Sequence, residues 1–305
     1  MAAGAPTKKA NAGPILLVLP CIFWGLHWPM VAIGLTELDA WTLRALAIVP
    51  AGVLLLGFLW LSGQSLAVPR RLIGPLLLAG VLNIAIFQVA LAFGIQFMNT
   101  GRAVIVVYTM PLWTALFGVW FLGEKLTRTR IAALSLGMCG LGVLLSQDLS
   151  AMANAPLGIA LCLLAAAAFG GGTVAVRSQD WRIPSALIAG WQLILGGIPV
   201  LAGALLAAPV VDWPSISLKV WLTVVYALLL SQLVPYILWF RGVQLYPAVM
   251  SGLATLSIPI IGVLSGALIM DDPLGWRELL ALGIVCGALL LVVLEPGGSA
   301  QTKLQ

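Results

Sequence analysis

The sequence predicts an all-α polytopic membrane protein with ten transmembrane helices, arranged as two five-helix repeats of inverted orientation. Three observations support this fold class. Hydrophobic residues make up 62% of the 305 residues and charged ones 8%. Apolar stretches long enough to span a bilayer recur along the whole chain. The second half of the sequence also repeats the pattern of the first half without a gap over some fifty residues.

The composition excludes a soluble domain, because a mean hydropathy of +1.11 leaves too little polar side-chain surface to face water. A helix of roughly 20 apolar residues crosses about 30 Å of hydrocarbon. Ten stretches satisfy this length, and the connections between them are too short for a further domain. The stretches are 14–35, 41–62, 72–96, 101–122, 129–146, 155–176, 183–208, 217–240, 246–270 and 276–294.

Within the first half, each stretch has its own mark. The first carries two prolines, Pro20 and Pro29, which predict an irregular helix. The second has tryptophans near both ends, as expected at membrane interfaces. The third is polar at Asn83 and Gln88, and the fourth has a central proline, Pro111. From residue 131 to 145, the fifth carries one polar side chain, Ser135.

The second half follows the same order. Around the sixth stretch, Gly158 and Gly170 repeat Gly13 and Gly25 at an offset of 145. The seventh stretch carries Gln192 and a central proline, Pro199. Polar and aromatic side chains mark the eighth, and Pro259 marks the ninth. The tenth has no polar side chain between residues 279 and 294. Stretches five and ten are therefore expected to be scaffold, since polar groups in a membrane face protein or water.

The internal repeat is clearest where residues 94–145 align with residues 242–293 at an offset of 148. Matches at glycine, glutamine and proline are the informative ones, since leucine and alanine match easily in an apolar chain. They pair Gly94 with Gly242, Gln96 with Gln244, Pro111 with Pro259 and Gly118 with Gly266. Because each half has an odd number of spans, the second half enters the bilayer from the opposite side. Such inverted repeats are typical of secondary transporters.

The positive charges predict the orientation. Eleven of the fifteen Lys and Arg residues flank the even-numbered connections and the termini, and four flank the other side. This bias places both termini in the cytoplasm. The net charge of +5 is therefore explained by topology, and no nucleic-acid surface is expected. The sequence has one histidine and no Cys-x-x-Cys pair, so no metal, cofactor or catalytic residue is expected.

Several short segments carry a family resemblance. The first copy has Ala92–Ala103, Tyr108–Leu112 and Phe121–Leu126, which ends in Gly123-Glu124 before Leu126; the second has Leu238–Gln244, Ser257–Ile260 and Met270–Leu274. With Phe23-Trp24-Gly25, these segments resemble the EamA repeat of the drug/metabolite transporter superfamily. The second copy departs from the pattern by carrying Asp271-Asp272 in place of Gly-Glu. Length and tryptophan content are similar to those of YddG-type exporters of aromatic amino acids.

The resemblance implies two EamA-like repeats, 14–147 and 151–295, around a central cavity, with short tails at 1–13 and 296–305. Polar or aromatic side chains deep in the spans are the expected cavity residues: Trp24, His27, Trp28, Asn83, Gln88, Tyr108, Trp113, Trp191, Gln232, Tyr236 and Trp239. Pro111 and Pro259 are expected hinges for gating. Arg44, near the outer end of its span, is open to two interpretations: snorkelling toward the interface, or attraction of a substrate carboxylate.

The expected function is an inner-membrane secondary transporter that exports small amphipathic metabolites, chiefly aromatic or apolar amino acids, by alternating access. No carboxylate lies in the middle of a span, which favours facilitated diffusion over proton coupling. A proton-coupled exporter of drugs, nucleosides or metabolites is the alternative within the superfamily. A membrane enzyme or a pore is the alternative of another class. The Gly-x-x-x-Gly pairs at 262–266 and 283–287 indicate close helix packing, and a monomer is expected rather than a dimer.

Overall fold

The computed structural model describes residues 15–97, 106–146, 156–269 and 275–293. Over these residues the chain is helical and contains no strand. The helices are α1 Ile15–Gly34, α2 Ala40–Leu61, α3 Arg70–Gly80, η1 Val81–Ile86, α4 Phe87–Phe97, α6 Met110–Leu122, α7 Arg128–Leu145, α9 Pro156–Arg177, α10 Ser185–Ala207, η2 Trp213–Ser215, α11 Leu218–Tyr226, η3 Ala227–Leu233, α12 Val234–Leu245, α13 Ala248–Ala254, α14 Ser257–Ile269 and α15 Trp276–Val293.

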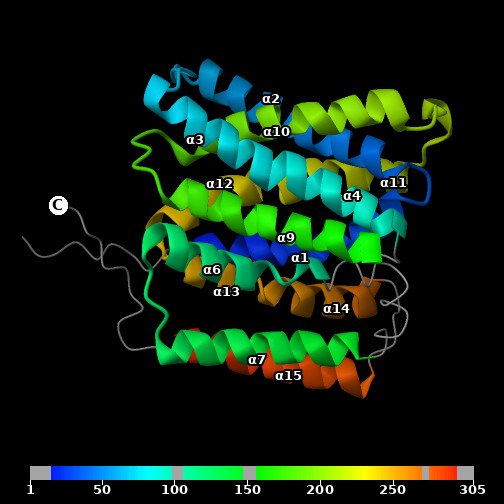
Figure 1. The fold of residues 1–305 in the computed structure, drawn as a ribbon. Coiled ribbons are helices and arrows are strands. Elements are labelled where there is room, and N and C mark those ends of the chain that lie inside the picture. The colour runs from blue at the N-terminus through cyan, green and yellow to red at the C-terminus, as the bar shows by residue number, and fades with distance from the viewer. Residues whose placement is uncertain (1–14, 98–105, 147–155, 270–274, 294–305) are drawn as a thin grey trace, which may run out of the picture.

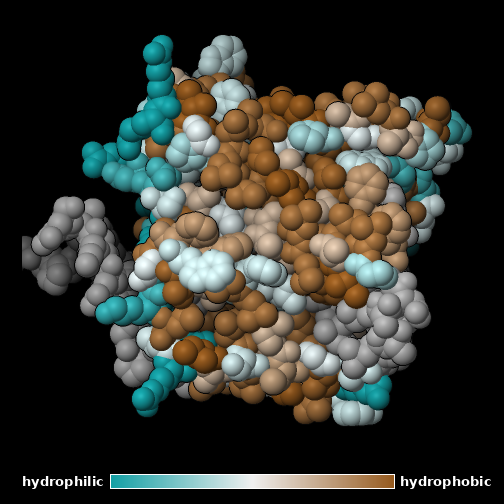
Figure 2. Space-filling view, viewed as in Figure 1, coloured by the Kyte–Doolittle hydropathy of each residue, from teal (hydrophilic) through white to brown (hydrophobic). Residues whose placement is uncertain are grey.

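Length and hydropathy make six of the described helical segments able to cross a membrane, and three shorter apolar helices accompany them. The six are 40–61, 70–91, 156–177, 185–207, 218–245 and 250–269; the three are 15–31, 110–122 and 279–288. The remaining expected stretch, 129–146, forms α7, which falls in neither group. Figure 2 shows hydrophobic residues over the middle of the visible face, with hydrophilic side chains gathered mainly at one end. The protein is thus an integral, multi-pass membrane protein.

The helices stack as a bundle in which α1 is central (Figure 1). It packs against α11, α12 and α14, while α2 packs along α10 and α4 along α9. The pair α7 and α15 lies together at one edge of the bundle. These are the fifth and tenth expected spans, and neither contributes a side chain to the central cavity.

Short polar residues fix several helix ends. The Asp39 carboxylate accepts hydrogen bonds from the backbone N–H groups of Trp41 and Thr42 at 2.9 and 3.2 Å, and so starts α2. The Ser217 hydroxyl oxygen accepts from Val220 N–H and starts α11 in the same way. Gly123 ends α6 with a φ of 64°, a left-handed conformation that suits glycine. These caps position the ends of the helices that surround the cavity.

Two π-helical segments interrupt the bundle at corresponding places in the two halves. Segment η1 lies between α3 and α4, and η3 lies between α11 and α12. Neither was predicted from the sequence. A π-helical turn holds an additional residue, so it rotates the side chains that follow relative to a regular helix. In both halves this rotation occurs just where the helix borders the cavity.

Some sequence expectations lie outside the described residues. They are the two tails, the junction between the repeats around Asp148, the Arg102 connection and the pair Asp271-Asp272.

Candidate functional site

A central cavity opens between α1, α2, α4, α9 and the η3–α12 helix. Its empty volume, counted with its mouth, is about 1130 Å³. The wall is mostly apolar and aromatic. It extends from Trp24, halfway along α1, to Leu35 and Ala40, where α1 turns into α2. The mouth therefore lies near the α1–α2 turn, at the end opposite the cytoplasmic end predicted from the charges.

Trp24 anchors the closed end of the cavity. Its indole N–H donates a 2.9 Å hydrogen bond to the backbone carbonyl oxygen of Ser231, which lacks an α-helical donor four residues on because Pro235 has no N–H. Its ring packs edge-on against Tyr236 and Trp239, with ring centroids 5.6 and 5.3 Å apart. Phe169 from α9 completes the cluster, 6.2 Å from Trp24. Trp24, Tyr236 and Phe169 line this end of the cavity, and Trp239 packs behind them.

A second aromatic contact joins α1 to the segment before α6. The Trp28 indole N–H donates a 2.6 Å hydrogen bond to the Tyr108 hydroxyl oxygen, and the rings meet edge-on. Both side chains line the cavity. The bond satisfies two polar atoms in an apolar wall, so the rings can present their faces to a ligand without an unpaired group.

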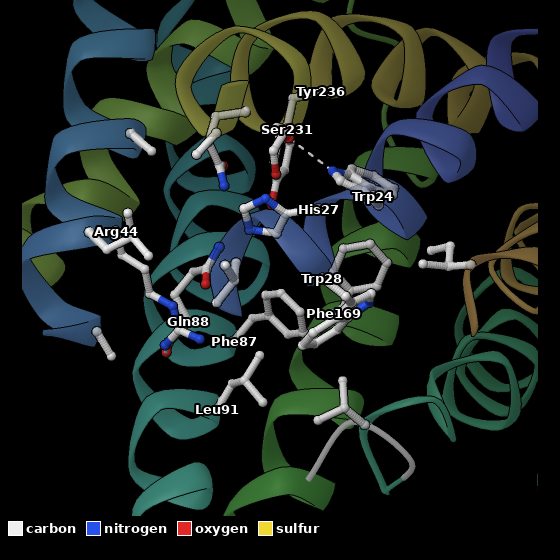
Figure 3. A pocket seen from close by; sticks show the side chains of 18 of the residues that line it. Trp24, His27, Trp28, Arg44, Phe87, Gln88, Leu91, Phe169, Ser231 and Tyr236 are labelled. Atoms are coloured by element: carbon white, nitrogen blue, oxygen red, sulfur yellow. Dashed lines mark hydrogen bonds between the residues drawn. The ribbon is translucent and has the colours of Figure 1, made fainter. Parts of the chain in front are cut away.

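The polar groups of the cavity are few. His27 stacks nearly parallel to Tyr226 at 6.4 Å, and its buried Nδ1 atom has no hydrogen-bond partner among the described residues. The Oε1 atom of Gln232 is buried and unpartnered in the same sense. The Nη1 group of Arg44 donates a 2.8 Å hydrogen bond to the backbone carbonyl oxygen of Gln88. In Figure 3, Arg44 and Gln88 lie on one side of His27, and Trp24, Trp28 and Phe169 on the other.

Arg44 is the charged residue of the described cavity wall, which includes no Asp or Glu. Two carboxylates, Glu37 and Asp39, lie near the mouth, and neither lines the cavity. Glu37 accepts a 2.7 Å hydrogen bond from Ser217 N–H. Asp39 caps α2 through one carboxylate oxygen, while the other is buried without a partner among the described residues. The described cavity is therefore lined by net positive charge.

Seven of the eleven expected cavity residues line this cavity. They are Trp24, His27, Trp28, Gln88, Tyr108, Gln232 and Tyr236. They come from both halves of the chain and from four different parts of the bundle. The repeat pattern alone does not predict that these parts lie next to one another.

The other four do not line the cavity. Asn83 is fully buried and bonds to Gln192 of α10, and Trp239 lies beneath Trp24 in the aromatic cluster. The Trp191 indole N–H donates to the carbonyl oxygen of Leu66, in the connection after α2. Trp113 packs against Phe117 on its own helix, α6. Depth in a span does not tell which neighbour a side chain faces, and none of these four side chains lines the described cavity.

The two expected hinge prolines occupy helix starts rather than bends in continuous helices. Pro111 lies in the first turn of α6, directly after a turn at Tyr108 and Thr109. Pro259 lies in the first turn of α14, after a turn at Thr255 and Leu256. A proline suits the first turn because that position lacks an intrahelical N–H bond. Both spans are therefore broken at matching positions of the repeat.

Several cavity residues were not expected from the sequence, among them Phe87, Phe169 and Ser231. Phe87 and Phe169 contribute apolar walls, with ring centroids 5.2 Å apart, and Ser231 contributes the carbonyl that receives the Trp24 bond. A phenylalanine in an apolar span carries no signal of its own. Ser231 stands directly before Gln232 in the eighth stretch, and that position is the signal that could have found it.

Comparison with known proteins agrees with this architecture. The model of the EamA-like transporter family matches twice, over residues 11–146 and 156–294. The chain is 28% identical to Protein PecM of Dickeya dadantii over 90% of this chain and 89% of that one. It is 24% identical to a "Probable amino-acid metabolite efflux pump" of Escherichia coli, over 92% and 94%. It is 23% identical to the "Uncharacterized transporter YoaV" of Bacillus subtilis, over 88% and 90%.

A solved crystal structure has the same fold. Its TM-score is 0.81 at 20% identity, over 94% of this chain and 98% of that one. The two matches to the family model cover nearly the whole chain, one in each half. The protein belongs to the EamA-like transporter family and is a membrane transporter.

Proposed function

We propose that the protein is an inner-membrane secondary transporter that exports small amphipathic metabolites, chiefly aromatic or apolar amino acids. The observation that carries this proposal is the aromatic-walled cavity, which extends from Trp24 to the exposed Leu35 just past the end of α1. Flat aromatic walls bind apolar side chains through area and stacking. A few polar groups on one side, His27, Gln88 and Arg44, would orient the polar end of the solute.

The proposal includes ten membrane spans in two inverted repeats, 14–147 and 151–295, with the tails 1–13 and 296–305 in the cytoplasm. The recurrence of π-helical segments before α4 and before α12 supports this symmetry. So does the recurrence of helix breaks before Pro111 and Pro259. Alternating access then exchanges the conformations of the two halves, and these breaks serve as hinges.

Transport needs binding energy that differs between two conformations, and no covalent chemistry, so we propose no enzymatic activity. Driven by the solute's own gradient, the carrier works by facilitated diffusion. The absence of a carboxylate from the described cavity wall favours this over proton coupling. A proton-coupled exporter is the second candidate, and the position of His27 in the wall favours it.

Counterflow in proteoliposomes tests the proposal. Vesicles loaded with unlabelled phenylalanine should accumulate labelled phenylalanine from outside, which an alternating carrier does and a pore does not. Trp28→Phe removes the bond to Tyr108 and should slow counterflow. Trp120→Phe is the matched control, because Trp120 is 65% exposed on the outside of the bundle. Equal rates in both variants, or no counterflow with any of a panel of amino acids, would refute the assignment.

Cysteine labelling tests the proposed orientation. In a variant without its four native cysteines, Ser65→Cys should react from the cytoplasmic side and Ser215→Cys from outside. Both side chains are exposed, at opposite ends of the bundle, in the connections after α2 and before α11. The reverse pattern would contradict cytoplasmic termini.

A further inference from the structure

We infer that the group recognised in the cavity is a carboxylate, bound by Arg44, and that the solute's ammonium group is dispensable. This inference rests on the proposed transport function and narrows its substrate class to carboxylates with an apolar or aromatic body. It follows from the place, the direction and the partners of the Arg44 side chain.

The direction of the side chain argues against snorkelling. Arg44 lies one turn into α2, about 6 Å from its start at Ala40. Its partner Gln88 lies nine residues before the end of α4, or about 13 Å of helix rise. The two helices run in opposite directions, and the rings of Trp41 and Phe93, 5.5 Å apart, set them in register near these ends. As a result, Gln88 lies deeper than Arg44. The guanidinium therefore reaches inward, away from the nearer water, which a snorkelling arginine does not do.

The partners leave the charge uncompensated. A guanidinium has five N–H donors, and among the described residues Arg44 makes one hydrogen bond, to a neutral carbonyl oxygen. No described Asp or Glu lines the cavity with it. A cation held in an apolar environment is costly unless it is paired. A solute carboxylate would supply both the missing charge and acceptors for the remaining donors, in the two-point geometry that arginine favours.

The same electrostatics discriminates between solutes. An amine of the same shape carries the charge of Arg44 and finds no carboxylate in the described wall, so the cavity repels it. A zwitterionic amino acid satisfies Arg44 with its carboxylate. A carboxylic acid without an ammonium group does so equally well. Three ligands with one phenyl body therefore separate the possibilities: phenylalanine, 3-phenylpropionate and phenethylamine.

The direct test measures ligand binding to the purified full-length protein in detergent. Intrinsic tryptophan fluorescence reports binding, because Trp24 and Trp28 line the cavity. We expect phenylalanine and phenylpropionate to bind with affinities within about threefold, and phenethylamine to bind at least about tenfold more weakly. Arg44→Gln should weaken phenylpropionate binding by about ten- to a hundredfold, as expected for loss of a charge-assisted hydrogen bond. Arg44→Lys keeps the charge and should lose less.

Two controls separate recognition from folding. Arg44→Gln retains a donor for the Gln88 carbonyl, so a purely structural role predicts unchanged binding. Arg70→Gln removes an exposed arginine at the other end of the bundle and should leave all three affinities unchanged. If Arg44→Gln does not fold, the affinities of the wild-type protein and of Arg44→Lys for the three ligands still test the inference.

Stronger binding of phenethylamine than of phenylpropionate overturns the inference, and so does undiminished phenylpropionate binding by folded Arg44→Gln. Failure of both carboxylates to bind also overturns it. Failure of the transport proposal looks different: phenylpropionate would bind with the expected dependence on Arg44, but proteoliposomes would show no counterflow.

Discussion

The Asn83 side-chain amide donates a 2.9 Å hydrogen bond to the Oε1 atom of Gln192, and both side chains are fully buried. The bond joins η1 to α10, away from the cavity. We expect Asn83→Leu and Gln192→Leu each to lower stability by about 1 to 3 kcal/mol, because each leaves a buried polar partner unpaired. The double variant should lose less than the sum, and ligand affinity should stay unchanged. Thermal unfolding in detergent and a binding assay on the same samples check this; additive losses would contradict the pairing.

The pair also shows what sequence reasoning could and could not reach. The apolar stretches, the duplication and the expectation that the fifth and tenth stretches lie away from the cavity follow from composition and sequence pattern. Whether Asn83 or Gln88 faces the cavity depends on the π-helical turn that ends between them at Ile86. The sequence of η1 does not predict this turn, because the segment contains neither proline nor glycine.

Two tryptophans also show that the sequence does not predict which side chains line the cavity. Trp24 and Trp239 are both deep and aromatic, yet one lines the cavity and the other lies beneath it. Their sequence contexts do not differ in a way that decides this. The answer is set by the packing of α1 against α12, which joins residues more than two hundred positions apart. For Arg44, the sequence left two directions of the side chain open. The hydrogen bond to the Gln88 carbonyl oxygen shows that the side chain points inward.

Gly25 is expected to be intolerant of substitution. A Cβ atom there would lie 2.5 Å from the Cβ atom of Ile261 on α14 and 3.1 Å from the carbonyl oxygen of Ile258. Gly25→Ala should therefore force α1 and α14 apart and cost about 1 to 3 kcal/mol. Gly283→Ala is the matched control, because a Cβ atom at that position would meet nothing within 4 Å and helical propensity improves. In thermal unfolding, the melting temperature of Gly283→Ala should equal or exceed that of the wild type. A Gly25→Ala variant that melts at the wild-type temperature would refute the close contact between α1 and α14.

Glu124 links the two halves at the end opposite the cavity mouth. Its Oε1 atom accepts a 2.7 Å hydrogen bond from Ala248 N–H, at the start of α13, and lies 4.0 Å from Arg177 Nε. Glu124→Gln keeps the acceptor but loses the charge, and Glu124→Ala loses both. We therefore expect melting temperatures to fall in the order wild type, Gln, Ala, with Lys125→Gln unchanged as the neighbouring exposed control. If Ala and Gln melt alike, the backbone hydrogen bond contributes nothing.

Glu37 should give the protein an acid-sensitive contact outside the membrane. The hydrogen bond from Ser217 N–H lowers the Glu37 pKa from its ordinary value of 4.5. The folded-state pKa then lies below the unfolded one, so the contact stabilises above pH 4.5 and this contribution is lost as the pH falls through the folded-state pKa. Glu37→Gln should be less stable than wild type at about pH 7, and the difference should shrink below pH 4.5. Melting curves across that range check it, and a difference that does not vary with pH would contradict it.

Whether transport is coupled to protons can be tested at His27. With no Asp or Glu in the described cavity wall, the imidazole of His27 is the wall's candidate proton carrier. Facilitated diffusion predicts that counterflow persists when a protonophore collapses the proton gradient. It also predicts that His27→Ala changes affinity more than the pH dependence of the rate, since the ring then serves as a polar contact stacked on Tyr226. Protein-free vesicles supply the leak correction. A rate that follows an imposed proton gradient, and loses that dependence in His27→Ala, would make His27 the proton carrier and establish the coupled exporter. A gradient dependence that survives the substitution would place the proton on a group outside the cavity wall, and facilitated diffusion would fail in that case too.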